Sequence, residues 1–119
     1  MLPLLHRQRY QEFQQALQQL HSCVTATHFE MSALRGNFQE VQQLFQTQIT
    51  TLSADDLAPD YTSRWQSIQT EVYKQMRLLQ TDIMLLLSSR SLETSQRRIV
   101  SVCDRIKTLI QYCEVLLQL

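Results

Sequence analysis

Two histidines and a cysteine lie close together in the sequence and are the residues best suited to bind a metal ion. His21, Cys23 and His28 offer the imidazole and thiol ligands that zinc prefers. They supply two or three ligands of a zinc site, but no second cluster completes it. The Glu-x-x-His pairs with which helical bundles bind metals are absent. The sequence therefore predicts no metal site and no cofactor.

Cys103 and Cys113 are the other residues that could do chemistry, as nucleophiles beside a histidine base. Nucleophilic catalysis requires an activated side chain, a base and an oxyanion site. Both cysteines fall on the apolar sides of a predicted C-terminal helix, where a buried thiol is unreactive. The single glycine, Gly36, leaves no loop able to cradle a phosphate. We therefore expect a protein that is not an enzyme.

The charge of the chain limits the kinds of molecule that the protein is expected to bind. Its 119 residues carry 11 basic and 11 acidic side chains, and this balance argues against nucleic-acid binding, which depends on neutralised phosphates. Residues 61–119 hold eight basic and five acidic side chains, a mild bias that favours an acidic patch on a protein partner.

The apolar segments and the cysteines indicate the cellular location of the protein. The longest apolar run, Ile83 to Leu87, has five residues, whereas a membrane span needs about 20. The first residues lack the charged and apolar regions of a signal peptide, and three cysteines fit reduced thiols. We expect a cytoplasmic protein that does not enter the membrane.

Composition and periodicity together predict an all-α fold. One glycine, two prolines and one asparagine cannot supply the turns of a β-protein, whereas leucine and glutamine are good helix formers. Apolar residues recur every three or four positions over four segments, which predicts helices at about 4–24, 28–52, 60–88 and 92–118. Short polar connections make such helices antiparallel neighbours. The expected architecture is one domain over residues 1–119, an antiparallel up-down four-helix bundle.

The first half of the chain leaves alternatives open. Thr27 and Glu30 have the spacing of a capping box, which favours a break at 24–28. The heptad register of Tyr10, however, continues unbroken to Leu52. That register allows a long N-terminal helix followed by two shorter helices, and such a chain would have to dimerise to bury its apolar stripe. Gly36 and Asn37 offer a further possible break.

The second half is less ambiguous. The segment from Ser53 to Asp60 is the clearest linker, because Asp55, Asp56 and Pro59 all disfavour helix interiors. Ser91 or Ser95 can cap the last helix. From Leu78 onward the apolar surface of the third helix widens, which predicts the most buried end of the bundle there.

Six residues are candidates for binding a protein. Four arginines gather around the start of the last helix, and Tyr61 and Trp65 begin the third helix beside the acidic linker. A solvated face and a packed core are the ordinary roles of such residues, whereas a docking patch for an acidic partner is the alternative. The arginines are Arg90, Arg97, Arg98 and Arg105.

Four stretches of the chain together resemble one known family. They are LLHRQRYQEF at 4–13, NFQEVQQLF at 37–45, LLQTDIM at 78–84 and DRIKTLIQYC at 104–113. This pattern is similar to the cyanobacterial heterocyst-frequency control protein family, PatD, and the likeness covers nearly the whole chain. The resemblance implies a small cytoplasmic regulator that limits heterocyst differentiation by binding the tubulin-like division protein FtsZ and modulating its polymer assembly. It carries over no catalytic residues.

Two other functions stay open beside this one. A structural helical homo-oligomer, as small as a homodimer, would use the unbroken heptad register and the glutamine-covered first helix. An adaptor for a different protein partner would use the arginines in the same way.

Overall fold

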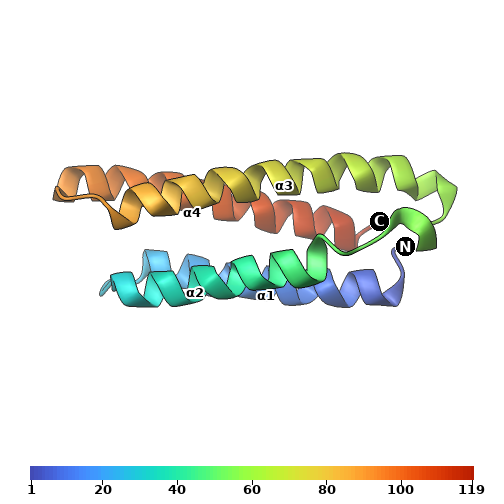
Figure 1. Cartoon of the computed structure of the whole chain (residues 1–119), viewed down its shortest axis with the longest axis horizontal. Coiled ribbons are helices and arrows are strands. Elements are labelled where there is room, and N and C mark those ends of the chain that lie inside the picture. Colours follow the sequence, from blue (N-terminus) through green and yellow to red (C-terminus); the bar gives the residue numbers. More distant parts are fainter.

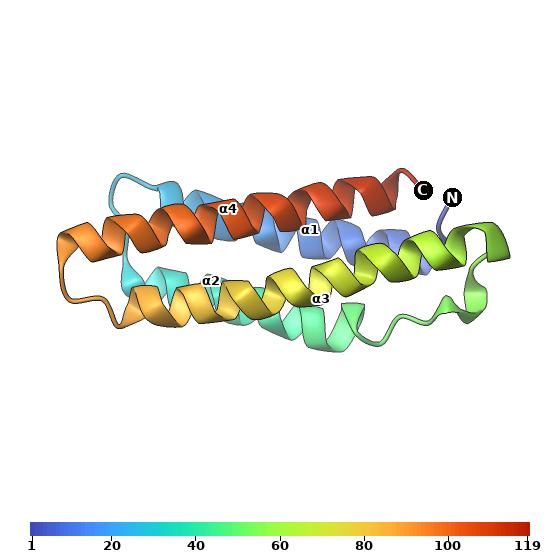
Figure 2. The same cartoon turned by 90° about the horizontal axis from the view of Figure 1, so that it is seen from above.

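The computed structural model describes residues 1–119 and contains helices but no strands. Four long helices run in alternating directions, α1 (Leu4–Thr25), α2 (Met31–Leu44), α3 (Pro59–Leu87) and α4 (Leu92–Leu117). They form a rod of 50 × 20 × 19 Å (Figures 1 and 2). The predicted antiparallel four-helix bundle is confirmed. None of these helices is both long and apolar enough to cross a membrane.

The break between the first two helices lies where the helix propensity is poor. α1 ends at Thr25, and the backbone is extended at Ala26 and Glu30 before α2 begins. The alternative of one long N-terminal helix is therefore wrong. The capping box is also wrong, because α2 starts only at Met31 and no side chain caps it. The half-buried Phe29 packs against the core from within this extended connection.

α2 is continuous but shorter than expected. It passes through Gly36 and Asn37 without a break, and Asn37 Nδ2 donates a hydrogen bond to the Ala33 carbonyl 2.8 Å away. The helix then changes into a π-helical turn, η1 (Phe45–Ile49), instead of reaching residue 52. A loop with a short 3₁₀ turn, η2 (Ala54–Asp56), leads on to α3.

Local sequence signals account well for α3 and α4. Pro59 occupies the first position of α3, where its missing N–H costs no hydrogen bond. Ser91 caps α4, since its Oγ accepts a hydrogen bond from the Thr94 N–H at 3.1 Å. Of the two serines that could have served, Ser91 is the cap.

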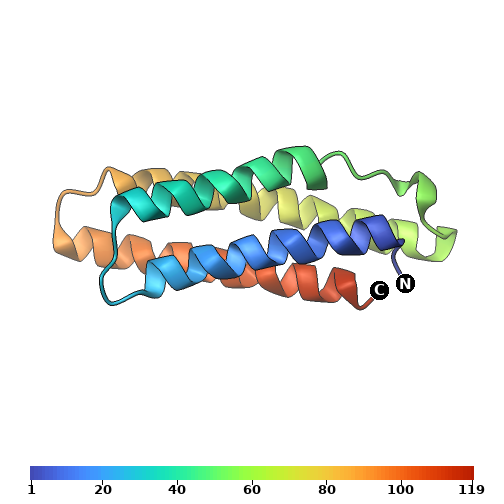
Figure 3. The ribbon, with the colours of Figure 1, turned by 90° about the horizontal axis from the view of Figure 1, so that it is seen from below.

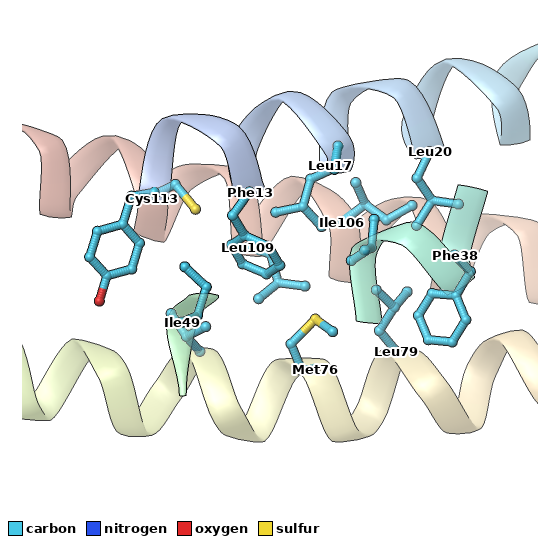
Figure 4. Packing of buried hydrophobic residues seen from close by; sticks show 14 of the residues in the cluster. Phe13, Leu17, Leu20, Phe38, Ile49, Met76, Leu79, Ile106, Leu109 and Cys113 are labelled. Carbon is cyan, nitrogen blue, oxygen red and sulfur yellow. The ribbon is translucent and has the colours of Figure 1, made fainter. Parts of the chain in front are cut away.

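The core is one continuous cluster of apolar side chains from all four helices and η1. Each element contributes residues at helical spacing, so the side chains interlock along the axis of the bundle (Figure 4). Residues at its centre include Phe13, Leu17, Leu20, Phe38, Ile49, Met76, Leu79, Ile106, Leu109 and Cys113.

The helices do not pack equally closely. The backbones of α1 and α4, of α3 and α4, and of α1 and α2 run close together, whereas α2 and α3 approach each other least among the neighbouring pairs. Side chains bridge this wider seam. The rings of Phe45 and Tyr73 meet edge to face, with centroids 5.3 Å apart.

The α3–α4 connection projects beyond the α1–α2 connection at the same end of the rod (Figure 3). Both chain termini lie at the opposite end (Figure 1). Met84 and Leu85 lie on the outer face of α3 and are exposed, and Leu92 is exposed as well. The expectation that this end would be the most buried is therefore wrong. Only the core-facing side chains there, such as Ile83 and Leu86, are fully covered.

Candidate functional site

The projecting end of the bundle carries three of the four candidate arginines. We call residues 84–101 the tip. They comprise the last turn of α3, the connection to α4 and the first turns of α4. Arg90 lies on the connection, and Arg97 and Arg98 lie on α4. Their side chains form no hydrogen bond or ion pair within the molecule, so all three guanidinium groups are free to bind a partner.

Two of these arginines share a polar hollow. Thr94, Arg97, Arg98 and Ser101 fall at positions i, i+3, i+4 and i+7 of α4 and therefore occupy one helix face. They line a hollow of about 170 Å³ that contains no apolar residue. Two guanidinium groups and two hydroxyls can all donate hydrogen bonds, a combination that suits a carboxylate or another oxyanion.

The tip also carries exposed apolar side chains. Leu92 is 76% exposed, Met84 61% and Val100 60%. Exposed apolar side chains can contribute to an interface when they form a contiguous patch. Arginine and methionine are both enriched in protein interfaces. The tip therefore combines the two kinds of side chain that bind proteins.

The fourth arginine is already engaged. Arg105 Nε lies 3.1 Å from Asp82 Oδ2, and this is the one ion pair in the structure. It joins α4 to α3 at a partly exposed position, where such a pair contributes little stability. Glu93 and Arg97 lie four residues apart on α4, a spacing that favours an ion pair, but they do not form one. Arg105 thus has a structural partner, whereas the arginines of the tip have none.

The two aromatic candidates lie at the other end of the molecule, near the start of α3. Tyr61 is half-buried in the first turn of that helix. Trp65 is only 5% exposed, and its Nε1 donates a hydrogen bond to the Tyr10 hydroxyl at 2.9 Å. Trp65 is therefore part of the core and cannot anchor a partner from the surface. The structure does not bring these aromatic residues together with the arginines.

Trp65 belongs to a buried polar network that the sequence pattern did not reveal. The Tyr10 hydroxyl donates to Gln69 Oε1 at 2.6 Å, and Gln69 Nε2 donates to the Ile49 carbonyl at 3.2 Å. Burial raises the pKa of Tyr10 above its ordinary value, so its hydroxyl keeps its proton and remains a donor. The spacing could have revealed that Gln69 is buried, because it lies four residues after Trp65 and three before Val72 on the buried stripe.

His6 extends the polar interior toward the chain terminus. One ring nitrogen, Nε2, lies 2.9 Å from the Ser53 carbonyl, and the ring meets Trp65 edge to face at 5.8 Å. The network and His6 together tie α1 to η1, to the following loop and to α3. Each of these hydrogen bonds joins two segments that are distant in the sequence. The network therefore stabilises the fold.

The metal-ligating residues considered first do not form a site. No three histidine, cysteine, aspartate or glutamate side chains gather closely enough to hold a metal ion, and this includes His21, Cys23 and His28. His21 and Cys23 lie near the end of α1, whereas His28 lies in the connection to α2.

The three thiols should differ in reactivity. Burial raises the pKa of Cys113 to about 12, and it also raises the pKa of the half-buried Cys23 and Cys103. Since the thiolate is the nucleophile, we expect iodoacetamide at pH 8 to label Cys113 last and far more slowly than the other two. Timed mass spectrometry measures this order, and the same reaction in urea should label all three alike. Rapid labelling of Cys113 in the folded protein would contradict its burial.

Comparison with known proteins gives no relative, since no family model, curated protein or solved structure matches the chain. What the tip can bind must therefore be inferred from its own side chains. It offers unpaired cations, hydroxyl donors and exposed apolar side chains.

Proposed function

We propose that this protein is a non-enzymatic regulator that binds the division protein FtsZ through the tip and thereby modulates FtsZ polymer assembly. In this role it would act in the cytoplasm and limit the frequency of heterocysts. The observation that carries the binding function is the group of unpaired arginines beside exposed apolar side chains on a projecting end. The identity of the partner rests on the resemblance of the four sequence stretches to PatD.

Electrostatic attraction would bring the partner to the tip. The chain as a whole is neutral, but residues 84–101 contain three arginines and one acidic residue, Glu93. Such a local excess of positive charge attracts an acidic surface and speeds association at low ionic strength. The hollow between Arg97 and Arg98 would then receive a carboxylate of the partner.

Burial of apolar surface would supply the short-range part of the affinity. Met84 and Leu92 expose most of their surface, and covering one such side chain fully contributes roughly 1.5–3 kcal/mol. Affinity from these side chains would persist at high salt, whereas the contribution of the arginines would fall. The proposed complex should therefore weaken with salt without disappearing.

The test is binding of purified FtsZ by the wild type and by the double variant Arg97→Glu/Arg98→Glu. We expect the variant to bind at least about tenfold more weakly at low salt, equivalent to about 1.4 kcal/mol. Its effect on light scattering by FtsZ polymers should decline in parallel. Arg64→Glu is the matched control, because Arg64 is an exposed arginine near the start of α3, far from the tip.

Two outcomes would overturn the proposal. One is equal affinity of the wild type and the double variant for FtsZ, and the other is no binding of FtsZ by the wild type. Light scattering of the protein alone then addresses the second candidate, a homo-oligomer. The exposed Met1, Leu4 and Leu5 at the opposite end favour that candidate, and a mass near 14.0 kDa at every concentration would remove it.

A further inference from the structure

A second surface, separate from the tip, follows the wide seam between α2 and α3. A hollow of about 280 Å³ opens along this seam. Phe45, Tyr73 and Met76 supply its apolar lining, and Gln42 of α2 and Gln46 of η1 line it from the side opposite α3. The hollow exists because α2 and α3 approach each other least among the neighbouring helices.

This hollow continues along α3. Two further hollows lie on the helix, one reaching back to Trp65 and one passing Lys74 and Arg77. Tyr73 lines all three, so the hollows adjoin one another and outline a shallow groove along the surface of α3. The groove extends from Trp65 to Gln80, which is about 22 Å at the helical rise of 1.5 Å per residue. We call this surface the α3 groove.

The charges of the α3 groove all have one sign. Lys74 and Arg77 line it, no acidic residue does, and neither cation has an ion-pair partner. Arg35 stands one heptad before Gln42 on α2 and therefore lies on the same helix face. A ligand of this surface would meet two or three uncompensated positive charges beside an apolar floor.

We propose that the α3 groove binds an acidic amphipathic helix of a partner protein. Its length matches about four helical turns. The hollow over Phe45 and Met76 would accept one large apolar side chain, and acidic side chains on the flank of the ligand would pair with Lys74 and Arg77. Such a helix would lie along the outer side of the seam, because the rings of Phe45 and Tyr73 already bridge the space beneath it.

Two synthetic 18-residue helical peptides test this proposal. Both carry leucines at i, i+3, i+4 and i+7, but one has glutamates on its flanks and the other has lysines. We expect the acidic peptide to bind and the basic peptide to bind at least tenfold more weakly. Amide shifts in the ¹⁵N-labelled protein should gather around Phe45, Tyr73 and Arg77. The variant Lys74→Glu/Arg77→Glu should reverse the preference between the peptides.

The control variant is Arg97→Glu/Arg98→Glu, which alters the tip and should leave peptide binding unchanged. Equal affinity for the two peptides, no binding of the acidic peptide, or shifts confined to residues 84–101 would each overturn the proposal. Failure of FtsZ binding at the tip would not affect this result, because the two surfaces are tested with different ligands and different variants.

Discussion

Replacing Trp65 with alanine should lower the free energy of unfolding by about 3–5 kcal/mol, in the range of other buried aromatic truncations. The Trp65 side chain is 5% exposed and lies among the core residues of α3. Alanine would leave a cavity and would remove both the hydrogen bond to Tyr10 and the ring contact with His6. Urea unfolding followed by circular dichroism measures the change.

Two further variants separate the causes of that loss. Trp65→Phe keeps most of the apolar volume but removes the N–H donor, so it should cost less than Trp65→Ala. Arg64→Ala, at the adjacent exposed position, should change stability by no more than about 0.5 kcal/mol. A cost below about 1 kcal/mol for Trp65→Ala would show that this side chain is not part of a packed core.

Gln69→Leu should also destabilise the protein, by roughly 1–3 kcal/mol, although leucine is the more apolar residue. The substitution leaves the Tyr10 hydroxyl without its acceptor, whereas the Ile49 carbonyl loses one donor and keeps the Leu52 N–H at 3.2 Å. Each buried polar group that loses its partner costs about 1–3 kcal/mol. Gln66→Leu is the control, because Gln66 is exposed one turn earlier on the same helix.

A double-mutant cycle with Tyr10→Phe makes this prediction specific. If the two side chains act through their shared hydrogen bond, the effects of Tyr10→Phe and Gln69→Leu should differ from additivity by about 0.5–3 kcal/mol. Strict additivity would mean that Gln69 acts only through its volume. The same urea transitions measure all four members of the cycle.

The bounds of the last two helices could be predicted to within one residue because their ends depend on local chemistry. Pro59 favours a helix start, and the Ser91 side chain caps its own helix. The start of α2 could not be predicted in the same way. Thr27 and Glu30 have the residue types of a capping box, but Phe29 between them packs into the core and the segment stays extended.

The residues of the candidate surface could be predicted only in part from the sequence. Spacing alone indicated the arginines of the tip, but the partner of Arg105 depends on the antiparallel register that brings Asp82 to it. Periodicity places Trp65 on the stripe but does not distinguish a core tryptophan from a surface anchor. The exposure of Leu92 and Met84 depends on which face of each helix packs inward, and that is a property of the assembled bundle.

The position of the two termini distinguishes the two ends of the rod. Both lie at one end of the rod, and the α3–α4 connection lies at the other (Figure 1). A fluorescent protein or a surface tether joined to either terminus would therefore lie at the opposite end of the 50 Å rod from the tip. In a protein immobilised in this way, the tip would face the solution and stay accessible to any molecule added to it.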